Sequence, residues 1–178
     1  VLFRSPFSSP KSVFLSSGTW SIMGREMKEP NVSETARAAG FSNEIGLGGT
    51  VRFLKNICGM WLIEESRRVW AREGEEYSYA AIVELARKAP ARKSLIDPDA
   101  QELSTPGDMP ARIVELCRRT GEPEPTNPGE ILRTAFDSLV LKYRYTFQTL
   151  EELGDGPYEA VHIVGGGAQN DFLNQMAA

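Results

Sequence analysis

The sequence has little of the material from which metal centres and disulfide frameworks are built. Its 178 residues include two cysteines and one histidine. Cys58 and Cys117 lie far apart, with no Cys-x-x-Cys spacing. Zinc sites and disulfide frameworks need several suitably spaced ligands or thiols, so neither is expected here. We interpret both cysteines as small buried hydrophobic side chains in a reducing cytoplasm.

Long apolar runs and an excess of positive charge are also absent. No stretch approaches the roughly 18 consecutive apolar residues that a membrane span needs. The formal net charge is −4 and the pI is near 5.2, with lysine and arginine scattered, so no basic stripe favours nucleic acid. We therefore expect neither a membrane nor a nucleic acid as partner. The 41% hydrophobic and 25% charged residues predict one globular domain with a sizeable core.

The first residues do not resemble the start of a gene product. They lack an initial Met, and they lack the charged region and apolar core of a signal peptide. We expect residues 1–12 to be a linker or a non-native tail, and residues 13–178 to be the domain.

Alternating apolar residues predict a β-hairpin near the N-terminus. An apolar run over 13–15 is followed by Ser16-Ser17-Gly18-Thr19, and alternation resumes over 20–23. This tip places hydroxyls and free amides at a turn, which suits a phosphate chain held by neutral donors. A serine-rich turn with no ligand is the alternative.

Apolar residues at spacings of three and four predict a long amphipathic helix over 50–72, with Thr50 as its N-cap. On such a helix Asn56 lies near the apolar side, where an unpaired amide costs about 1–3 kcal/mol, so it needs a partner. That partner is either a ligand or the backbone. Glu64 belongs to a charged run that ordinarily forms a solvated face.

Three later helices have clear capping signals. We expect them over 78–89, over 108–120 with Asp108 as cap, and from residue 128 onward with Asn127 as cap. The first of them ends before a proline, which disfavours helical geometry in the preceding residue.

A short strand over 160–164 runs directly into Gly165-Gly166-Gly167, and Asn170 opens another helix. Glycines let backbone N–H groups approach an anion closely, and a helix N-terminus carries partial positive charge. The run is not a good dinucleotide fingerprint, because Asn170 stands where the last glycine is required. Nucleotide contact and a tight structural turn both remain open for the triplet.

Two further sets of polar residues are interpreted as structural. His162 alternates with apolar neighbours along the strand and has no second histidine or cysteine to join. Asp97, Asp99 and Asp108 lie among prolines, as turn and cap residues do. We therefore expect no metal ligand and no catalytic carboxylate pair among these residues.

Five blocks of residues, taken in order, resemble the C-terminal domain of the FGGY carbohydrate kinases. The blocks are residues 16–21, 43–44 with 53–62, 106–110, 137–139 with 142–144, and 163–170 with 173–175. The likeness extends from about residue 13 to the last residue. Within the family, the Ser-Gly-Thr-Trp and Lys-Asn-Ile blocks favour members that act on L-rhamnulose over glycerol and xylulose kinases.

The resemblance implies an α/β fold of the actin-like ATPase type, in which two ribonuclease-H-like domains close over a cleft. ATP is then held mostly by the C-terminal domain, which this chain represents with both ends truncated. By that analogy Thr19, with Gly18, contacts the nucleotide phosphates. Gly166, with Gly165, Gly167 and Asn170, contacts the nucleoside side of ATP.

The same resemblance places Asn56 at the sugar and Glu64 at ATP. The family has a glutamine where this chain has Glu64. A negative charge near the nucleotide is unfavourable unless a metal ion, Arg67 or Arg68 offsets it.

The reaction that the resemblance implies is transfer of the ATP γ-phosphoryl group to the C1 hydroxyl of L-rhamnulose. Mg²⁺ neutralises charge in such a reaction, and an aspartate accepts the hydroxyl proton. In the family that aspartate lies in a His-Asp-Thr block upstream of the hairpin, and residues 1–12 do not match it. We therefore expect the catalytic base in a missing N-terminal domain. A kinase for another sugar of the family and a non-catalytic actin-like nucleotide-binding module are the alternatives.

Overall fold

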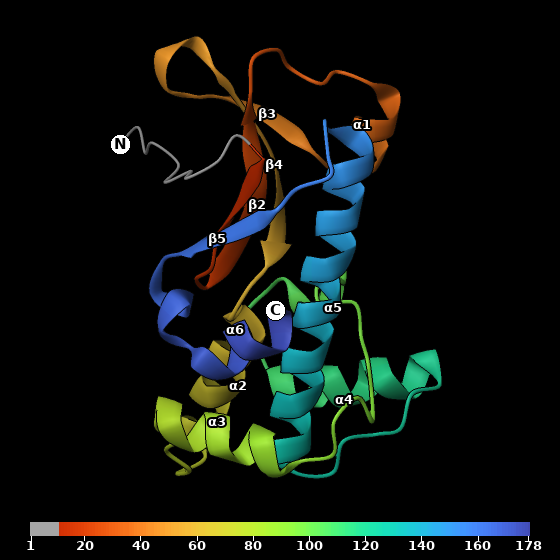
Figure 1. Cartoon of the computed structure of the whole chain (residues 1–178). Coiled ribbons are helices and arrows are strands. Elements are labelled where there is room, and N and C mark those ends of the chain that lie inside the picture. Colours follow the sequence, from red (N-terminus) through yellow and green to blue (C-terminus); the bar gives the residue numbers. More distant parts are fainter. Residues whose placement is uncertain (1–10) are drawn as a thin grey trace.

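The predicted N-terminal hairpin is confirmed and forms two strands of a mixed sheet (Figure 1). The computed structural model describes residues 11–178. Within them β1 (Ser12–Ser16) pairs antiparallel with β2 (Trp20–Met27). The first strand thus begins one residue before the expected start of the domain, and the rest of the expected linker, residues 1–10, lies outside the described residues.

The sheet has the strand order β3-β4-β2-β1-β5. Its other strands are β3 (Ser42–Ile45), β4 (Val51–Cys58) and β5 (Ala160–Val164). The strand β5 runs parallel to β1, with Val164 opposite Ser16, whereas the other pairs are antiparallel. Because parallel neighbours have their carboxyl ends at one edge, the hairpin tip and the glycine triplet meet there.

The predicted helix over 50–72 is wrong in its first half. Residues 51–58 form strand β4, and Thr50 lies at the end of a short 3-10 turn (η1, Leu47–Gly49). The helix α2 begins only at Trp61 and ends at Arg72. The strand β4 lies between β3 and β2, so it buries residues on both faces and lacks the alternation that marks a half-exposed strand.

The later helices are confirmed together with their caps. Ser78, Asp108, Asn127 and Asn170 each accept a hydrogen bond from a backbone N–H in the first turn of the helix that follows. Among the described residues, no helix is both long and apolar enough to cross a membrane. The helices other than α2 are α1 (Glu34–Ala38), α3 (Tyr79–Lys88), α4 (Met109–Thr120), α5 (Pro128–Leu153) and α6 (Asp171–Ala177).

The helix α5 connects the sheet to the other helices (Figure 1). It packs against the strands β2 and β4 and also against the helices α3 and α6. At the sheet, buried Tyr143 shares a 2.7 Å hydrogen bond with the hydroxyl of Ser21. Lys142 makes ion pairs of 2.8 and 3.0 Å with Asp97 and Asp99. The Tyr143 bond therefore joins α5 to β2, and the Lys142 ion pairs join α5 to the loop that carries Asp97 and Asp99.

Candidate functional site

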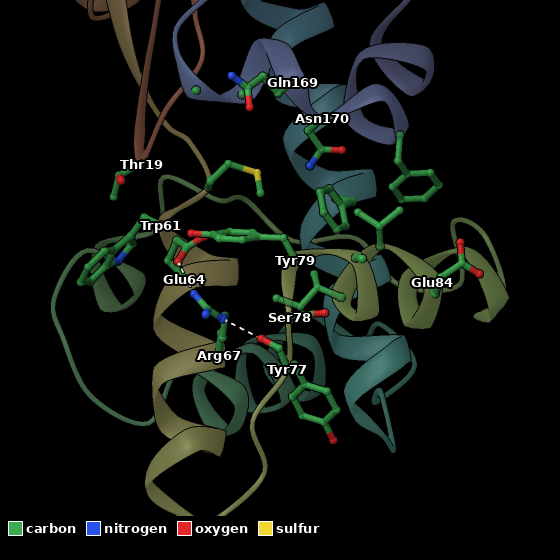
Figure 2. Close-up of a pocket in the computed structure, with 18 of the residues that line it drawn as sticks. Thr19, Trp61, Glu64, Arg67, Tyr77, Ser78, Tyr79, Glu84, Gln169 and Asn170 are labelled. Atoms are coloured by element: carbon green, nitrogen blue, oxygen red, sulfur yellow. Dashed lines mark hydrogen bonds and ion pairs between the residues drawn. The ribbon is translucent and has the colours of Figure 1, made fainter.

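A cavity of about 1560 Å³ opens between the hairpin tip, α2, α3 and the glycine triplet. Figure 2 shows Thr19, Glu64, Tyr79 and Asn170 around it. Of the residues expected at ATP, those that line this cavity are Gly18, Thr19, Glu64, Gly166, Gly167 and Asn170. Segments from both ends of the chain therefore form one concave site, as ligand sites commonly do.

The hairpin tip is held in place by backbone hydrogen bonds to two other elements. The carbonyls of Gly18 and Thr19 accept from the N–H groups of Met60 and Trp61, each at 2.9 Å. The Ser17 N–H donates to the Val164 carbonyl at 2.8 Å. The first amide of α2 is therefore used by the hairpin, whereas the Thr19 side chain lies exposed at the edge of the cavity.

The three glycines of the triplet have different surroundings. Gly165 has a φ of +89°, and a Cβ there would lie 2.6 Å from the Ser17 carbonyl oxygen. Gly167 donates its N–H to that carbonyl at 2.9 Å, and a Cβ on it would lie against the Ser17 hydroxyl. Gly166 has nothing within 4 Å of a Cβ and lines the cavity. The first and third glycines allow close packing, and the middle one faces open space.

Asn170 both caps a helix and lines the cavity. Its Oδ1 accepts from the Leu173 N–H at 3.0 Å, which begins α6. The Asn174 side chain donates to the Ala168 carbonyl at 2.9 Å and so fixes the turn before the helix. The wall that carries the glycine triplet is thus held by its own side chains.

Glu64 is paired with Arg67, one helical turn further along α2. Their side chains form an ion pair of 3.5 Å. The guanidinium also donates from Nε to the Tyr77 carbonyl at 2.8 Å, and its Cζ lies 4.7 Å from the centre of the Tyr79 ring. Arg67 is therefore the residue that offsets the charge of Glu64 (Figure 2).

Arg68 does not share this role. It pairs at 2.6 Å with Glu65, whose carboxylate is fully buried and also accepts from the Gly107 N–H at 3.0 Å. Of the two arginines considered for Glu64, only Arg67 is in position.

Asn56 has different surroundings from those expected. It lies on β4 opposite Ile22 and is exposed to solvent. The prediction that Asn56 needs a buried partner is therefore wrong, because it assumed a helix at residues that form strand β4. Asn56 does not line the cavity, so the structure does not place it beside the residues expected at ATP.

Sequence reasoning missed several residues of this cavity. Tyr79 and Trp61 line it, as do Arg87 and Phe172. Tyr79 directly follows the Ser78 cap. That cap was visible in the sequence, and it could have directed attention to the side chain beside it.

The described residues contain no group of three or more His, Cys, Asp or Glu side chains placed to hold a metal ion. Mg²⁺ is commonly held by one or two carboxylates together with substrate phosphates and water. Such a site needs fewer carboxylates than the cluster that is absent from the described residues, and Glu64 and Asp171 line the cavity, so this lining is compatible with a magnesium ion held chiefly by phosphates.

Comparisons with known proteins agree with this architecture. The model of the FGGY family of carbohydrate kinases, C-terminal domain, matches residues 13–178. The chain is 44% identical over 165 residues to a protein named rhamnulokinase from Bacteroides thetaiotaomicron, covering 93% of this chain and 33% of that protein. It is 41% identical over 178 residues to a rhamnulokinase from Enterobacter sp. strain 638, covering 100% of this chain and 36% of that protein.

Solved sugar kinases share the fold. A xylulose kinase from Rhodospirillum rubrum superposes with a TM-score of 0.69 at 15% identity, covering 97% of this chain and 34% of that one. A gluconate kinase from Lactobacillus acidophilus superposes with a TM-score of 0.64 at 13% identity, covering 95% of this chain and 33% of that one. The predicted α/β fold of the actin-like ATPase type is confirmed. This chain spans about a third of the length of the curated relatives, and it belongs to the FGGY family of carbohydrate kinases, whose C-terminal domain it matches.

Proposed function

We propose that residues 13–178 are the ATP-facing domain of a kinase that transfers the ATP γ-phosphoryl group to the C1 hydroxyl of L-rhamnulose. The observation that carries this proposal is the cavity that joins the hairpin tip to the glycine triplet. The substrate follows from the relatives named rhamnulokinase. The two free cysteines are buried and fit a cytoplasmic enzyme.

In this proposal the nucleotide lies along the cavity. Thr19, with Gly18, meets the phosphates at one edge, where a hydroxyl donor suits a phosphate oxygen. Gly166 and its neighbours face the nucleoside, because the backbone at Gly166 has no side chain that would hinder approach. On the α2 side of the cavity, the ion pair with Arg67 offsets the charge of Glu64.

Phosphoryl transfer needs groups that this domain does not supply. A magnesium ion held through the nucleotide phosphates would supply charge neutralisation. The proton of the sugar hydroxyl is accepted by an aspartate that we place in an N-terminal domain. Asn56, exposed on β4, is proposed to contact the sugar from the C-terminal side. The role of this chain is therefore to bind and orient the nucleotide.

A coupled ADP-release assay tests the proposal in the kinase that carries this domain. We expect L-rhamnulose to be used with a higher kcat/KM than L-fuculose, D-xylulose or glycerol. Another sugar as the best substrate would contradict the substrate assignment. Nucleotide binding without ADP release on any sugar would point instead to a non-catalytic nucleotide-binding module.

The Thr19→Val variant tests the hairpin within the same assay. Loss of the hydroxyl is expected to raise the KM for ATP by about tenfold, since a hydrogen bond to a charged group is worth about 1.5–3 kcal/mol. Thr35→Val, an exposed position on α1, is the matched control and should leave the KM unchanged. An unchanged KM for ATP in Thr19→Val would show that the hairpin tip does not contact the nucleotide.

A further inference from the structure

Tyr79 presents an aromatic ring to solvent inside the cavity. It is 58% exposed, as Tyr145 is at 57% on the surface of α5, yet only Tyr79 of the two lines the cavity. It is the first residue of α3, and the Ser78 hydroxyl, accepting from the Ala81 N–H at 3.2 Å, fixes the backbone at that point. The ring therefore projects from a well-defined helix start.

One face of this ring is already covered. The guanidinium of Arg67 lies over it, with Cζ 4.7 Å from the ring centre. Arg67 is itself held by the Tyr77 carbonyl and by Glu64. Partial burial and next the neighbouring Glu64 carboxylate raise the pKa of the Tyr79 phenol.

The rest of the cavity lies on the other side of the ring. Figure 2 shows Tyr79 in the middle of the view, with Arg67 below it and Gln169 and Asn170 above it. Those two residues follow the glycine triplet, where the nucleoside side of the nucleotide is proposed to lie. An aromatic face thus stands across the cavity from the wall that carries the triplet.

Arg67 is already engaged by several partners. Its guanidinium has a carbonyl, a carboxylate and an aromatic face as partners. A cation behind an aromatic ring is attracted to the ring and limits its movement. Arg67 is therefore suited to position Tyr79.

We propose that Tyr79 is the platform on which the base of the bound nucleotide stacks, with Arg67 as its positioning residue. The inference rests on the proposed function, because it assumes that the cavity binds a nucleotide. Stacking on an aromatic side chain tolerates any base, but a purine covers more of the ring than a pyrimidine does. The platform therefore favours purine over pyrimidine nucleotides.

Binding measurements on the 178-residue chain test this inference. Trp61 lines the same cavity, so tryptophan fluorescence can follow titration with ATP, CTP and inorganic tripolyphosphate. The test variants are Tyr79→Ala, Tyr79→Leu and Tyr79→Phe, and Tyr145→Ala is the matched control. Thermal melting of each variant verifies that it folds.

We expect Tyr79→Ala and Tyr79→Leu to weaken ATP binding by about tenfold, in the range measured for base stacking. Tyr79→Leu keeps an apolar side chain over Arg67. Weaker ATP binding in this variant therefore reports the loss of base stacking and not a loss of packing. Tyr79→Phe keeps the ring and should bind ATP within about twofold of the wild type. The preference for ATP over CTP should fall in the Ala and Leu variants, while tripolyphosphate binding stays unchanged in every variant.

Two results would overturn the platform, and a third concerns the proposed function. ATP binding equal to wild type in Tyr79→Ala would show that the ring does not meet the base. An equal loss for ATP and tripolyphosphate would show that Tyr79 acts through the fold or the phosphates. If the wild-type chain binds none of the three ligands, the proposed function fails and the platform fails with it.

Discussion

At the scale of single residues, Glu64 decides how much charge the cavity presents to a nucleotide. Its carboxylate lines the cavity, and the 3.5 Å ion pair with Arg67 offsets its charge. The sequence identified both residues and named Arg67 and Arg68 as possible partners for the charge. It did not show which arginine pairs with Glu64, because that depends on Glu65 drawing Arg68 away.

The Glu64→Gln variant should bind ATP more tightly than the wild type. Removing a negative charge near a triphosphate favours binding, by about two- to fivefold for a partly exposed group. Glu115→Gln is the control, since Glu115 is paired with Arg118 three residues later but lies on α4, away from the cavity. Titration of the two variants with ATP at several salt concentrations checks this. Weaker binding in Glu64→Gln would show that the carboxylate itself holds the nucleotide.

At the scale of elements, local signals predicted most of the site, but they misread strand β4 as a helix and did not identify helix α1 or strand β3. Caps and alternation were sufficient for the hairpin and for most of the helices, because each of those signals is contained in a few consecutive residues. The strand β4 buries Phe53, Leu54, Ile57 and Cys58, a spacing that also fits one side of a helix. Only its neighbours in the sheet distinguish the two, and these come from other parts of the chain.

The glycine triplet offers a paired test of structure against function. Gly165→Ala should lower the free energy of unfolding by about 1–3 kcal/mol, because its φ is positive and a Cβ would meet the Ser17 carbonyl. Gly166→Ala should leave stability nearly unchanged, since a Cβ there meets nothing within 4 Å. It should nevertheless weaken ATP binding, because the methyl group enters the cavity.

Thermal melting and ATP titration of the two variants provide the measurement. If Gly166→Ala bound ATP as the wild type does, the middle glycine would not face the nucleotide. If Gly165→Ala melted like the wild type, the described turn would be incorrect.

At the scale of the whole molecule, the core explains the behaviour expected of the two thiols. Burial, and next the charge of Asp99, raises the pKa of Cys58 to about 12. Burial, and next the charge of Glu122, raises the pKa of Cys117 to about 11. The sequence predicted two buried cysteines from their number and spacing alone, and that prediction is confirmed.

Both thiols should resist a thiol reagent in the folded chain and react fully in denaturant. The pKa of each thiol is higher in the folded chain than in the unfolded chain, where it is about 8.5. The contribution of each buried thiol to the free energy of unfolding is therefore fully present below about pH 8.5. Stability is then lost as the pH rises toward 11 and 12. Labelling with a disulfide reagent at pH 8, and urea unfolding between pH 8 and 11, provide the measurement.

Thr35→Cys, which introduces a thiol at an exposed position, is the positive control and should label at once. Rapid labelling of the wild-type chain under native conditions would contradict the described core.

The central claim is that a nucleotide occupies the cavity between the hairpin tip and the glycine triplet. The most direct test is to follow the backbone amide resonances of the chain by NMR during titration with ATP. We expect saturable shifts at Thr19, Trp61, Gly166 and Asn170, which line that cavity. A second cavity is lined by residues that include Arg144 and Met176. Shifts confined to that cavity, or no saturable shifts at all, would contradict the account.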